Sequence, residues 1–209
     1  MKKYFFYFSF LFFLNTLFLS AQERINQFDK DGKRDGIWKK YHSNKLVRYV
    51  GQFKNGKEIG VFKFYNMTTN DFPEMVKSFS EKNDSAKVEY YSKKGIVESR
   101  GFMLKKHRIG KWNYFNDEGT AIMIEENYEN GYLNGLSKIF YKNGKLAEIK
   151  NFDNGKLEGN FKRYAINGNL ISDLNYLKGK LEGLAKYYNS KGEFTGGIAS
   201  SIYRFVFLT

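Results

Sequence analysis

The sequence predicts an all-β protein, an elongated single-layer antiparallel sheet built from about seven tandem β-hairpin repeats of ~24 residues. A glycine recurs about every 24 residues, and two turn sequences follow it within each repeat. A unit of this length cannot bury its own apolar side, so the copies must stack on one another. The segments between the turns are too short for ordinary helices and are rich in Tyr, Phe, Ile and Leu. These residues favour strands, so each repeat is expected to contain two of them.

The repeats follow the pattern Gly-x-(aromatic)-Lys-x-(Tyr/Phe), with single positions replaced in several copies. The first position, the repeat glycine, is occupied by Gly36, Gly60, Gly110, Gly135, Gly159 and Gly183, with Ala86 in its place in the third copy. Five residues later come the repeat aromatics, which are Tyr41, Tyr65, Tyr91, Phe115, Phe140, Tyr164 and Tyr188. The constant offset keeps seven copies in register, so we expect the repeats to cover residues 36 to 194.

Turn glycines separate the strands and lie at Gly56, Gly131, Gly144, Gly155, Gly168, Gly179 and Gly192. An asparagine precedes five of them, in the pairs at 55–56, 130–131, 143–144, 154–155 and 167–168. Asn-Gly supplies the two positive-φ residues of a tight type I′ turn, so we expect such turns at these pairs. Pro73 lies between residues 67 and 84, where the pattern is loosened and a longer loop or bulge is expected.

The N-terminal residues 1–21 have the pattern of a signal peptide. Lys2 and Lys3 precede an apolar run that ends in Ser20-Ala21, and cleavage is expected after Ala21. The alternative is an uncleaved anchor, because the run is close to the ~17 residues that a spanning helix needs. Membrane contact is expected only through such an anchor. Both alternatives predict an exported protein, periplasmic or at the cell surface.

The two ends of the repeat region have separate expectations. Residues 22–35 are expected to form an N-terminal cap strand, and residues 195–209 an apolar cap or an edge strand. An uncovered apolar edge strand favours association with another chain. The absence of cysteine excludes a lipid-modified N-terminal cysteine and a disulfide framework.

The chain is strongly basic, with a net charge of +13. Lysines lie three residues after the repeat glycine, at Lys39, Lys63, Lys138, Lys162 and Lys186. They are expected to form one column on one face, about 10 Å apart, which is close to the screening length at ~0.1 M salt. Two alternatives stay open: a solvated face that discourages aggregation, or a track for a polyanion. An exported protein meets lipid, cell-wall polymers and other proteins, so no nucleic acid is expected as a partner.

The aromatic side chains are expected to occupy both faces. Residues two and four after the repeat glycine share one face, whereas the repeat aromatics share the face of the lysines. Second-strand rings, which are Phe53, Tyr128, Phe152 and Tyr176, are expected to interleave between the repeat aromatics as a ladder. The alternative is an exposed platform for sugar rings or an extended peptide. The candidate binding residues are Lys39, Tyr41, Lys63, Tyr65, Lys138, Phe140, Lys162, Tyr164, Lys186 and Tyr188.

The sequence predicts no catalytic residue, no metal site and no cofactor. The two histidines, His42 and His107, fall in different repeats without further ligands nearby. Glu125 and Glu126 are adjacent on a predicted strand and point to opposite faces, so they do not form an acid/base pair. The expected protein is not an enzyme.

Two segments carry a family resemblance. Residues 152–159 read Phe-Asp-Asn-Gly-Lys-Leu-Glu-Gly and residues 176–183 read Tyr-Leu-Lys-Gly-Lys-Leu-Glu-Gly, and residues 53–60 and 128–135 are similar. This pattern resembles the MORN repeat, in the bacterial variant often labelled an antitoxin of toxin-antitoxin systems. The resemblance covers about residues 26–194. It implies a single-layer sheet of hairpins that serves as a scaffold for proteins, and in some members contact with phospholipid.

The expected function is that of an exported, non-enzymatic scaffold that binds another macromolecule, with a cell-envelope protein as the first choice. The alternatives are a module that binds cell-wall glycan or lipopolysaccharide, and an antitoxin-like partner protein as the family label implies.

Overall fold

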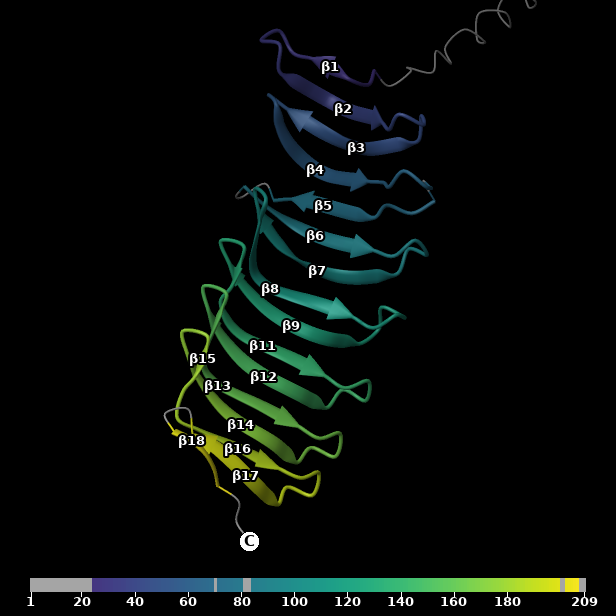
Figure 1. The fold of residues 1–209 in the computed structure, drawn as a ribbon. Helices are drawn as coiled ribbons and strands as arrows, with labels where there is room; N and C mark the ends of the chain where they lie inside the picture. The colour runs from purple at the N-terminus through teal and green to yellow at the C-terminus, as the bar shows by residue number, and fades with distance from the viewer. Residues whose placement is uncertain (1–23, 70, 81–83, 200–201, 207–209) are drawn as a thin grey trace, which may run out of the picture.

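The computed structural model describes residues 24–69, 71–80, 84–199 and 202–206. The predicted signal peptide lies outside these residues. The described part is one open, elongated antiparallel sheet made of consecutive hairpins, and it contains no helix (Figure 1). Accordingly, no helix capable of crossing a membrane is found among the described residues. The predicted fold class is confirmed.

The strands are β1 (Gln27–Phe28), β2 (Arg34–Tyr41), β3 (Val47–Lys54), β4 (Lys57–Phe64), β5 (Met75–Phe79), β6 (Ser85–Tyr91), β7 (Val97–Leu104), β8 (His107–Phe115), β9 (Ile122–Glu129), β10 (Tyr132–Leu133), β11 (Gly135–Phe140), β12 (Leu146–Asp153), β13 (Lys156–Tyr164), β14 (Leu170–Leu177), β15 (Lys180–Leu181), β16 (Leu184–Tyr188), β17 (Phe194–Ala199) and β18 (Ile202–Val206). Each strand from β1 to β9 pairs with the next along the chain. In the fifth and seventh repeats the first strand is interrupted next to the repeat glycine and forms two short strands. β9 therefore pairs with both β10 and β11, and β14 pairs with both β15 and β16.

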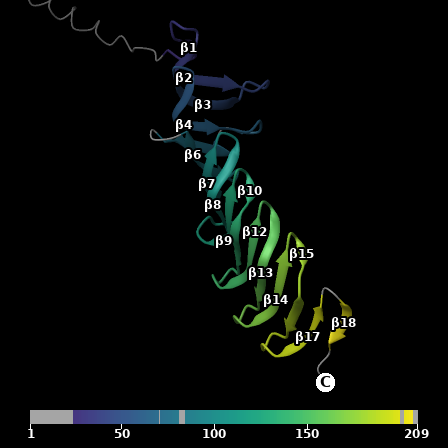
Figure 2. The same cartoon turned by 90° about the vertical axis from the view of Figure 1, so that its left-hand side faces the viewer.

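Four of the repeat glycines, Gly36, Gly60, Gly110 and Gly159, lie within strands and bend them. Gly36, Gly60 and Gly110 have φ values of 71°, 64° and 60°, a region that glycine enters without steric cost. The pairing with the preceding strand skips at Gly60 and Gly110: Val50 opposes Lys63, but Gln52 opposes Ile59. In Figures 1 and 2, β4 and β8 turn sharply between the short hairpin turns and the body of the sheet. The single layer therefore forms a trough with an inner and an outer face.

The core lies on the inner face, on the residues two positions after the repeat glycine. They are Trp38, Phe62, Val88, Trp112, Ser137 and Ala185, all buried, and the half-buried Phe161; Phe53, Ala86 and Leu174 are buried as well. Trp112 is 0% exposed, although no second layer covers it. Because the strands bend toward this face, neighbouring side chains enclose the ring. The trough thus replaces the second layer that a flat sheet would need to bury its core.

Large and small side chains alternate between adjacent strands of this core. The Phe62 ring lies over Gly51 and the Trp112 ring lies over Gly101, so close that a Cβ at either glycine would fall 2.2 and 2.4 Å from ring atoms. In the seventh repeat the order is reversed: Leu174 precedes the small Ala185 at the corresponding positions. Each of these three pairs has one large and one small side chain, which suits dense packing.

The prediction that the second-strand rings interleave with the repeat aromatics is wrong, because the two sets of rings lie on opposite faces. Phe53 pairs with Gly36 and packs between Trp38 and Phe62, at centroid distances of 5.9 and 5.2 Å, on the inner face. The repeat aromatics lie on the outer face, because they are an odd number of residues from the repeat glycine. Their cross-strand partners are aliphatic in most repeats, at Val47, Val97, Ile122, Leu146 and Leu170.

Two kinds of turn alternate along the sheet. At Asn154-Gly155 both residues have positive φ, 46° and 81°, as the prediction of type I′ turns requires, and the pairs at 55–56 and 130–131 behave alike. The prediction is wrong at 143–144 and 167–168, where only the glycine has positive φ. There the loop is one residue longer: the N–H of Gly144 donates to the carbonyl of Tyr141, and Tyr141 pairs with Lys145. This is a type I turn followed by a glycine bulge.

The longer turns are joined from one repeat to the next by side-chain hydrogen bonds across 23 residues. Asn44 Nδ2 donates to the carbonyl of Met67, Tyr141 Oη to that of Tyr164, and Asn167 Nδ2 to that of Ser190, at 2.7, 2.7 and 2.8 Å. His42 Nε2 lies 2.9 Å from the carbonyl of Tyr65 in the same manner. These bonds satisfy carbonyls that face the end of the sheet and hold the stacked turns together.

Lys45 has a φ of 67° at the bulge position that glycine occupies in the other longer turns. A lysine side chain is strained there, so Lys45→Gly is expected to raise the free energy of unfolding by about 0.5–1 kcal/mol. Denaturant unfolding followed by circular dichroism measures the change. The control is Lys94→Gly, one residue before Gly95 in a related turn and not at positive φ, which should give no gain. An equal gain in both variants would contradict the explanation.

The loosened region and the two ends depart in detail from the expected boundaries. Residues 67–84 contain a regular strand, β5, after the longer loop predicted around Pro73. In the expected N-terminal cap region, β1 pairs with the start of β2 through only two residues. The regular pattern continues past residue 194, because β17 completes the seventh hairpin as far as Ala199. β18 then pairs with β17, so it adds a strand at the sheet edge.

Candidate functional site

The lysines three residues after the repeat glycine lie in one row across the outer face. Lys39 opposes Val50, which opposes Lys63, and the same register continues from strand to strand. At the other end of the sheet, Lys138 opposes Ile149, which opposes Lys162. Lys186 follows in the seventh repeat, opposite Asp173. We refer to this line of side chains as the lysine row.

The lysine row contains acidic residues as well. In the middle of the sheet its positions are held by Glu89, Arg100, Asn113 and Glu125. Neighbouring cations pair with the carboxylates: Lys87 lies 2.9 Å from Glu89, and Lys111 lies 3.6 Å from Glu125. Lys162 lies 3.9 Å from Asp173. The outer face therefore carries a patterned mixture of charges rather than a uniform cationic track.

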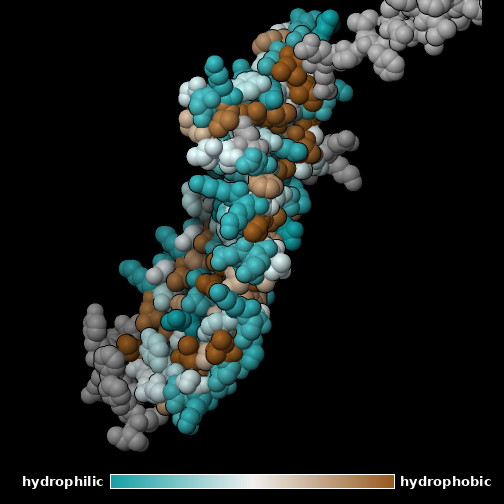
Figure 3. Space-filling model, turned by 90° about the vertical axis from the view of Figure 1, so that its right-hand side faces the viewer, coloured by the Kyte–Doolittle hydropathy of each residue, from teal (hydrophilic) through white to brown (hydrophobic). Residues whose placement is uncertain are grey.

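The repeat aromatics form a second line beside the lysine row, the aromatic stripe. Lys39 Nζ lies 5.4 Å from the centroid of the Tyr41 ring, and the Arg100 guanidinium lies 4.7 Å from that of Phe115. Tyr41 is 51% exposed, and the other members are half-buried. The alternation of side chains along the strands thus places the ten predicted binding residues on one face, where Lys39 and Tyr41 make a cation–π contact. Figure 3 views the end of the sheet with the longer turns, where apolar side chains gather most over the first strands.

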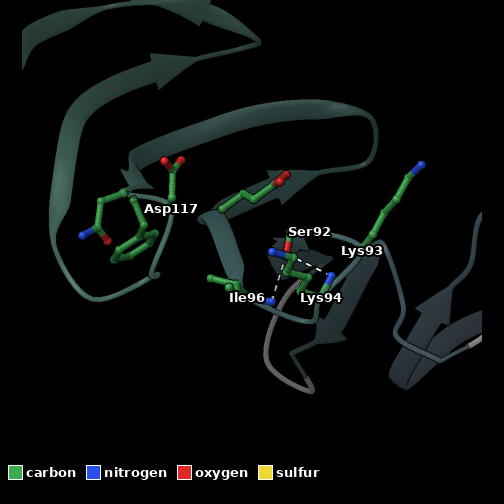
Figure 4. A pocket seen from close by; sticks show the side chains of 8 residues that line it. Ser92, Lys93, Lys94, Ile96 and Asp117 are labelled. Atoms are coloured by element: carbon green, nitrogen blue, oxygen red, sulfur yellow. Dashed lines mark hydrogen bonds between the residues drawn. The ribbon is translucent and has the colours of Figure 1, made fainter.

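Two hollows open near the middle of the sheet. One, with a volume of about 310 Å³, is lined by Lys87, Arg100, Gly101, Phe102, Lys111 and Asn113. The other, also of about 310 Å³, lies at two of the longer turns and is lined by Ser92, Lys93, Lys94, Ile96, Glu98, Phe115, Asn116 and Asp117 (Figure 4). Ser92 Oγ accepts from the N–H groups of Lys94 and Ile96, which fixes the turn, and the Lys93 side chain points away from the hollow.

A cluster of ionisable groups on the inner face was not predicted. The Arg108 guanidinium lies 4.3 Å from the Trp112 ring and donates to the hydroxyls of Tyr114 and Tyr128 at 2.6 and 3.2 Å. Tyr128 Oη donates to Glu126 at 2.7 Å. The cation–π contact and the charge-assisted hydrogen bonds together hold the Arg108 side chain over the Trp112 ring, on the inner side of the trough.

A sequence signal for this cluster exists. Arg34 lies over Trp38 at 5.0 Å in the first repeat, as Arg108 does over Trp112 in the fourth. Both tryptophans stand in the pattern Arg-x-Gly-x-Trp, whereas the fifth to seventh repeats have leucine in place of the arginine and no tryptophan. The bend at the repeat glycine lets the arginine reach back over the ring.

The tyrosines of the sheet predict a loss of stability at alkaline pH. Burial raises the pKa of Tyr114, and the hydrogen bond to Tyr128 and the charge of Glu126 add to this effect. Burial and Glu89 raise the pKa of Tyr91 in the same way. The folded protein therefore favours the neutral phenols, and this contribution is present below the ordinary pKa of about 10 and is lost as the pH rises above it.

Denaturant unfolding at a series of pH values from neutral to strongly alkaline measures this dependence. Tyr114→Phe is expected to reduce the decline above about pH 10, because phenylalanine does not titrate. Tyr132→Phe is the control, since Tyr132 is 61% exposed. An unchanged decline in Tyr114→Phe would contradict the assignment.

No group of three or more metal-ligating side chains is found within the described residues. His42 lies at a turn and His107 begins β8. Glu125 and Glu126 point to the outer and inner face, respectively, where they contact Lys111 and Tyr128.

No family model and no curated protein matches the chain. Among solved structures, the chain is similar to one entitled "Crystal structure of GtfA/B complex", with 14% sequence identity and a TM-score of 0.32. The match covers 46% of this chain and 19% of that chain. A likeness at this level carries no argument for fold or function.

Proposed function

We propose that this protein is an exported, non-enzymatic scaffold that binds another protein of the cell envelope through its outer face. The observation that supports the proposal is the aromatic stripe beside the lysine row, which recurs in register over the length of the sheet. Tyrosine and phenylalanine are enriched at protein interfaces, because they offer a large contact area with few rotatable bonds. The stripe provides such rings at regular spacing on an uncovered face.

The charges of the lysine row favour a protein over a polyanion. A polyanion gains affinity from each phosphate or carboxylate that it pairs with a cation, and acidic residues within the track would repel it. Glu89, Glu125 and Asp173 lie within the row and form salt bridges with neighbouring lysines. A pattern of both signs instead selects a partner with the complementary pattern.

The resemblance to MORN repeats supports the scaffold role, because hairpin arrays of that kind serve as binding surfaces. The basic, apolar N-terminal segment supports export and hence an envelope partner. A cell-wall or lipopolysaccharide-binding module is the second candidate, favoured by the excess of positive charge. An antitoxin-like partner protein is the alternative that the family label suggests.

The test is capture of proteins from an envelope extract on the immobilised protein at low and at moderate salt. A specific partner should be retained at both salt concentrations, because an apolar interface depends little on salt, whereas a polyanion should be lost. The variant Tyr41→Ser/Tyr164→Ser removes two rings of the stripe and is expected to weaken binding by roughly tenfold or more.

Tyr132→Ser is the matched control, because Tyr132 is more exposed than Tyr41 but lies outside the stripe. It should bind the same partner as the unmodified protein. Equal capture by all three proteins, or no captured protein at either salt concentration, would count against the proposed function.

A further inference from the structure

The hollow on β6, β7 and β8 differs from the rest of the outer face. It lies where the lysine row is interrupted, and the Phe102 ring in its wall is 49% exposed. Phe102 opposes Lys87 on β6, and Arg100 opposes Asn113 on β8. An uncovered ring therefore stands among three cations and one amide within a space of about 310 Å³. This volume is at the lower limit of ligand pockets and suits a single ring-sized group.

The side chains around the hollow carry an excess of positive charge, three cations against the two carboxylates of Glu89 and Glu125. Lys87 and Lys111 pair with Glu89 and Glu125, but the lysine side chains are 47% and 56% exposed, against 18% and 21% for the glutamates. Arg100 has no carboxylate within 4 Å among the described residues, and its guanidinium carbon lies 4.7 Å from the centroid of the Phe115 ring. A guanidinium without a carboxylate partner is well suited to bind a ligand carboxylate in a bidentate manner.

The amide of Asn113 completes the lining. Its Oδ1 is shielded from solvent and has no hydrogen-bond partner within the described residues. Such an atom is uncommon in folded proteins, because an unsatisfied buried acceptor is unfavourable. A hydroxyl group presented in the hollow would provide the donor that this amide lacks once the side chain turns toward it.

We infer that this hollow binds one acidic sugar ring of the uronic-acid type, as part of a longer glycan. The apolar C–H side of the ring packs on Phe102, the carboxylate pairs with Arg100, and a hydroxyl bonds to Asn113. This inference goes beyond the proposed protein partner and does not depend on it, since it concerns a different ligand and a part of the face outside the aromatic stripe except for Phe115.

The test is a titration of the purified, ¹⁵N-labelled protein with trigalacturonic acid, followed by NMR. The backbone amides of Gly101, Phe102 and Asn113 are expected to shift, with a dissociation constant in the millimolar range or below. The neutral counterpart, galactotriose, is expected to bind about tenfold more weakly, because it lacks the carboxylate.

Two variants and two matched controls locate the site. Phe102→Ala and Arg100→Gln should each weaken binding about tenfold. Leu136→Ala removes an equally exposed apolar side chain of the same face, 47% against 49%, and should bind as the unmodified protein does. Lys138→Gln removes a cation of the lysine row outside the hollow and should also leave binding unchanged.

The inference is overturned if these amides do not shift, if galactotriose binds equally well, or if neither variant weakens binding. The last ligand tested is hexaglutamate. If this peptide binds as tightly as trigalacturonic acid and shifts the same amides, the hollow recognises carboxylate alone, which would also overturn the sugar assignment. Arg100→Gln changes an exposed side chain, so it retains the fold if Phe102→Ala does not. Capture of envelope proteins is also measured with Phe102→Ala. This measurement distinguishes a failure of the sugar inference from a failure of the proposed protein-binding function.

Discussion

Replacing Trp112 by alanine is expected to lower the free energy of unfolding by about 3–5 kcal/mol. The ring is 0% exposed, and it contacts Tyr90 and Tyr128 at centroid distances of 6.1 and 6.4 Å. Its removal leaves a cavity at the centre of the trough and exposes the Arg108 cluster to water. Because each repeat is stabilised only by its neighbours, a defect in the middle of the array weakens both halves.

The measurement is denaturant unfolding followed by circular dichroism and by fluorescence of Trp38, the tryptophan that remains. Ser137→Ala is the matched control at the same position of the next repeat. Ser137 is buried and its hydroxyl has no partner among the described residues, so its removal should be neutral or slightly stabilising. A loss below about 1 kcal/mol in Trp112→Ala would mean that the ring is not a core residue.

The second large effect is expected at the glycine beneath this ring. Gly101→Leu places side-chain atoms where the Trp112 ring lies, since even a Cβ would be 2.4 Å from it. The expected loss is about 3 kcal/mol, typical of a severely overpacked core. Gly101 does not have a positive φ, so the expected loss comes from overpacking and not from backbone strain. A turn glycine such as Gly144 has a positive φ, so Gly144→Leu would add backbone strain and is not a suitable control.

The double variant Gly101→Leu/Trp112→Ala is expected to recover part of both losses. It recreates in the fourth repeat the order that Leu174 and Ala185 have in the seventh, with the large side chain on the earlier strand. A double-mutant cycle should therefore give a favourable coupling of about 1–3 kcal/mol. Strict additivity of the two single losses would show that the two positions do not share one packing volume.

The sequence determined the architecture through its period. The offset from Gly36 to Tyr41 recurs in all later repeats and that to Lys39 in four of them, which was sufficient to predict hairpins in register and to place the lysines and the repeat aromatics on one face. This works because side chains alternate along a strand, so that a residue's parity decides its face. The Asn-Gly pairs predicted where chain reversals occur, although at residues 143–144 and 167–168 they predicted the wrong turn type.

Only the tertiary structure decided how a single layer buries its core. The sequence identified Gly36 and its equivalents only as members of the repeat pattern. In the structure their positive φ bends the strands, and this bend forms the trough that encloses Trp112. The ring of Phe53 joined the inner face, Arg108 reached over a tryptophan, and Phe102 remained exposed among cations drawn from three strands. These contacts depend on distances between residues of different repeats, and such distances are set by bend and register rather than by any local pattern of residues.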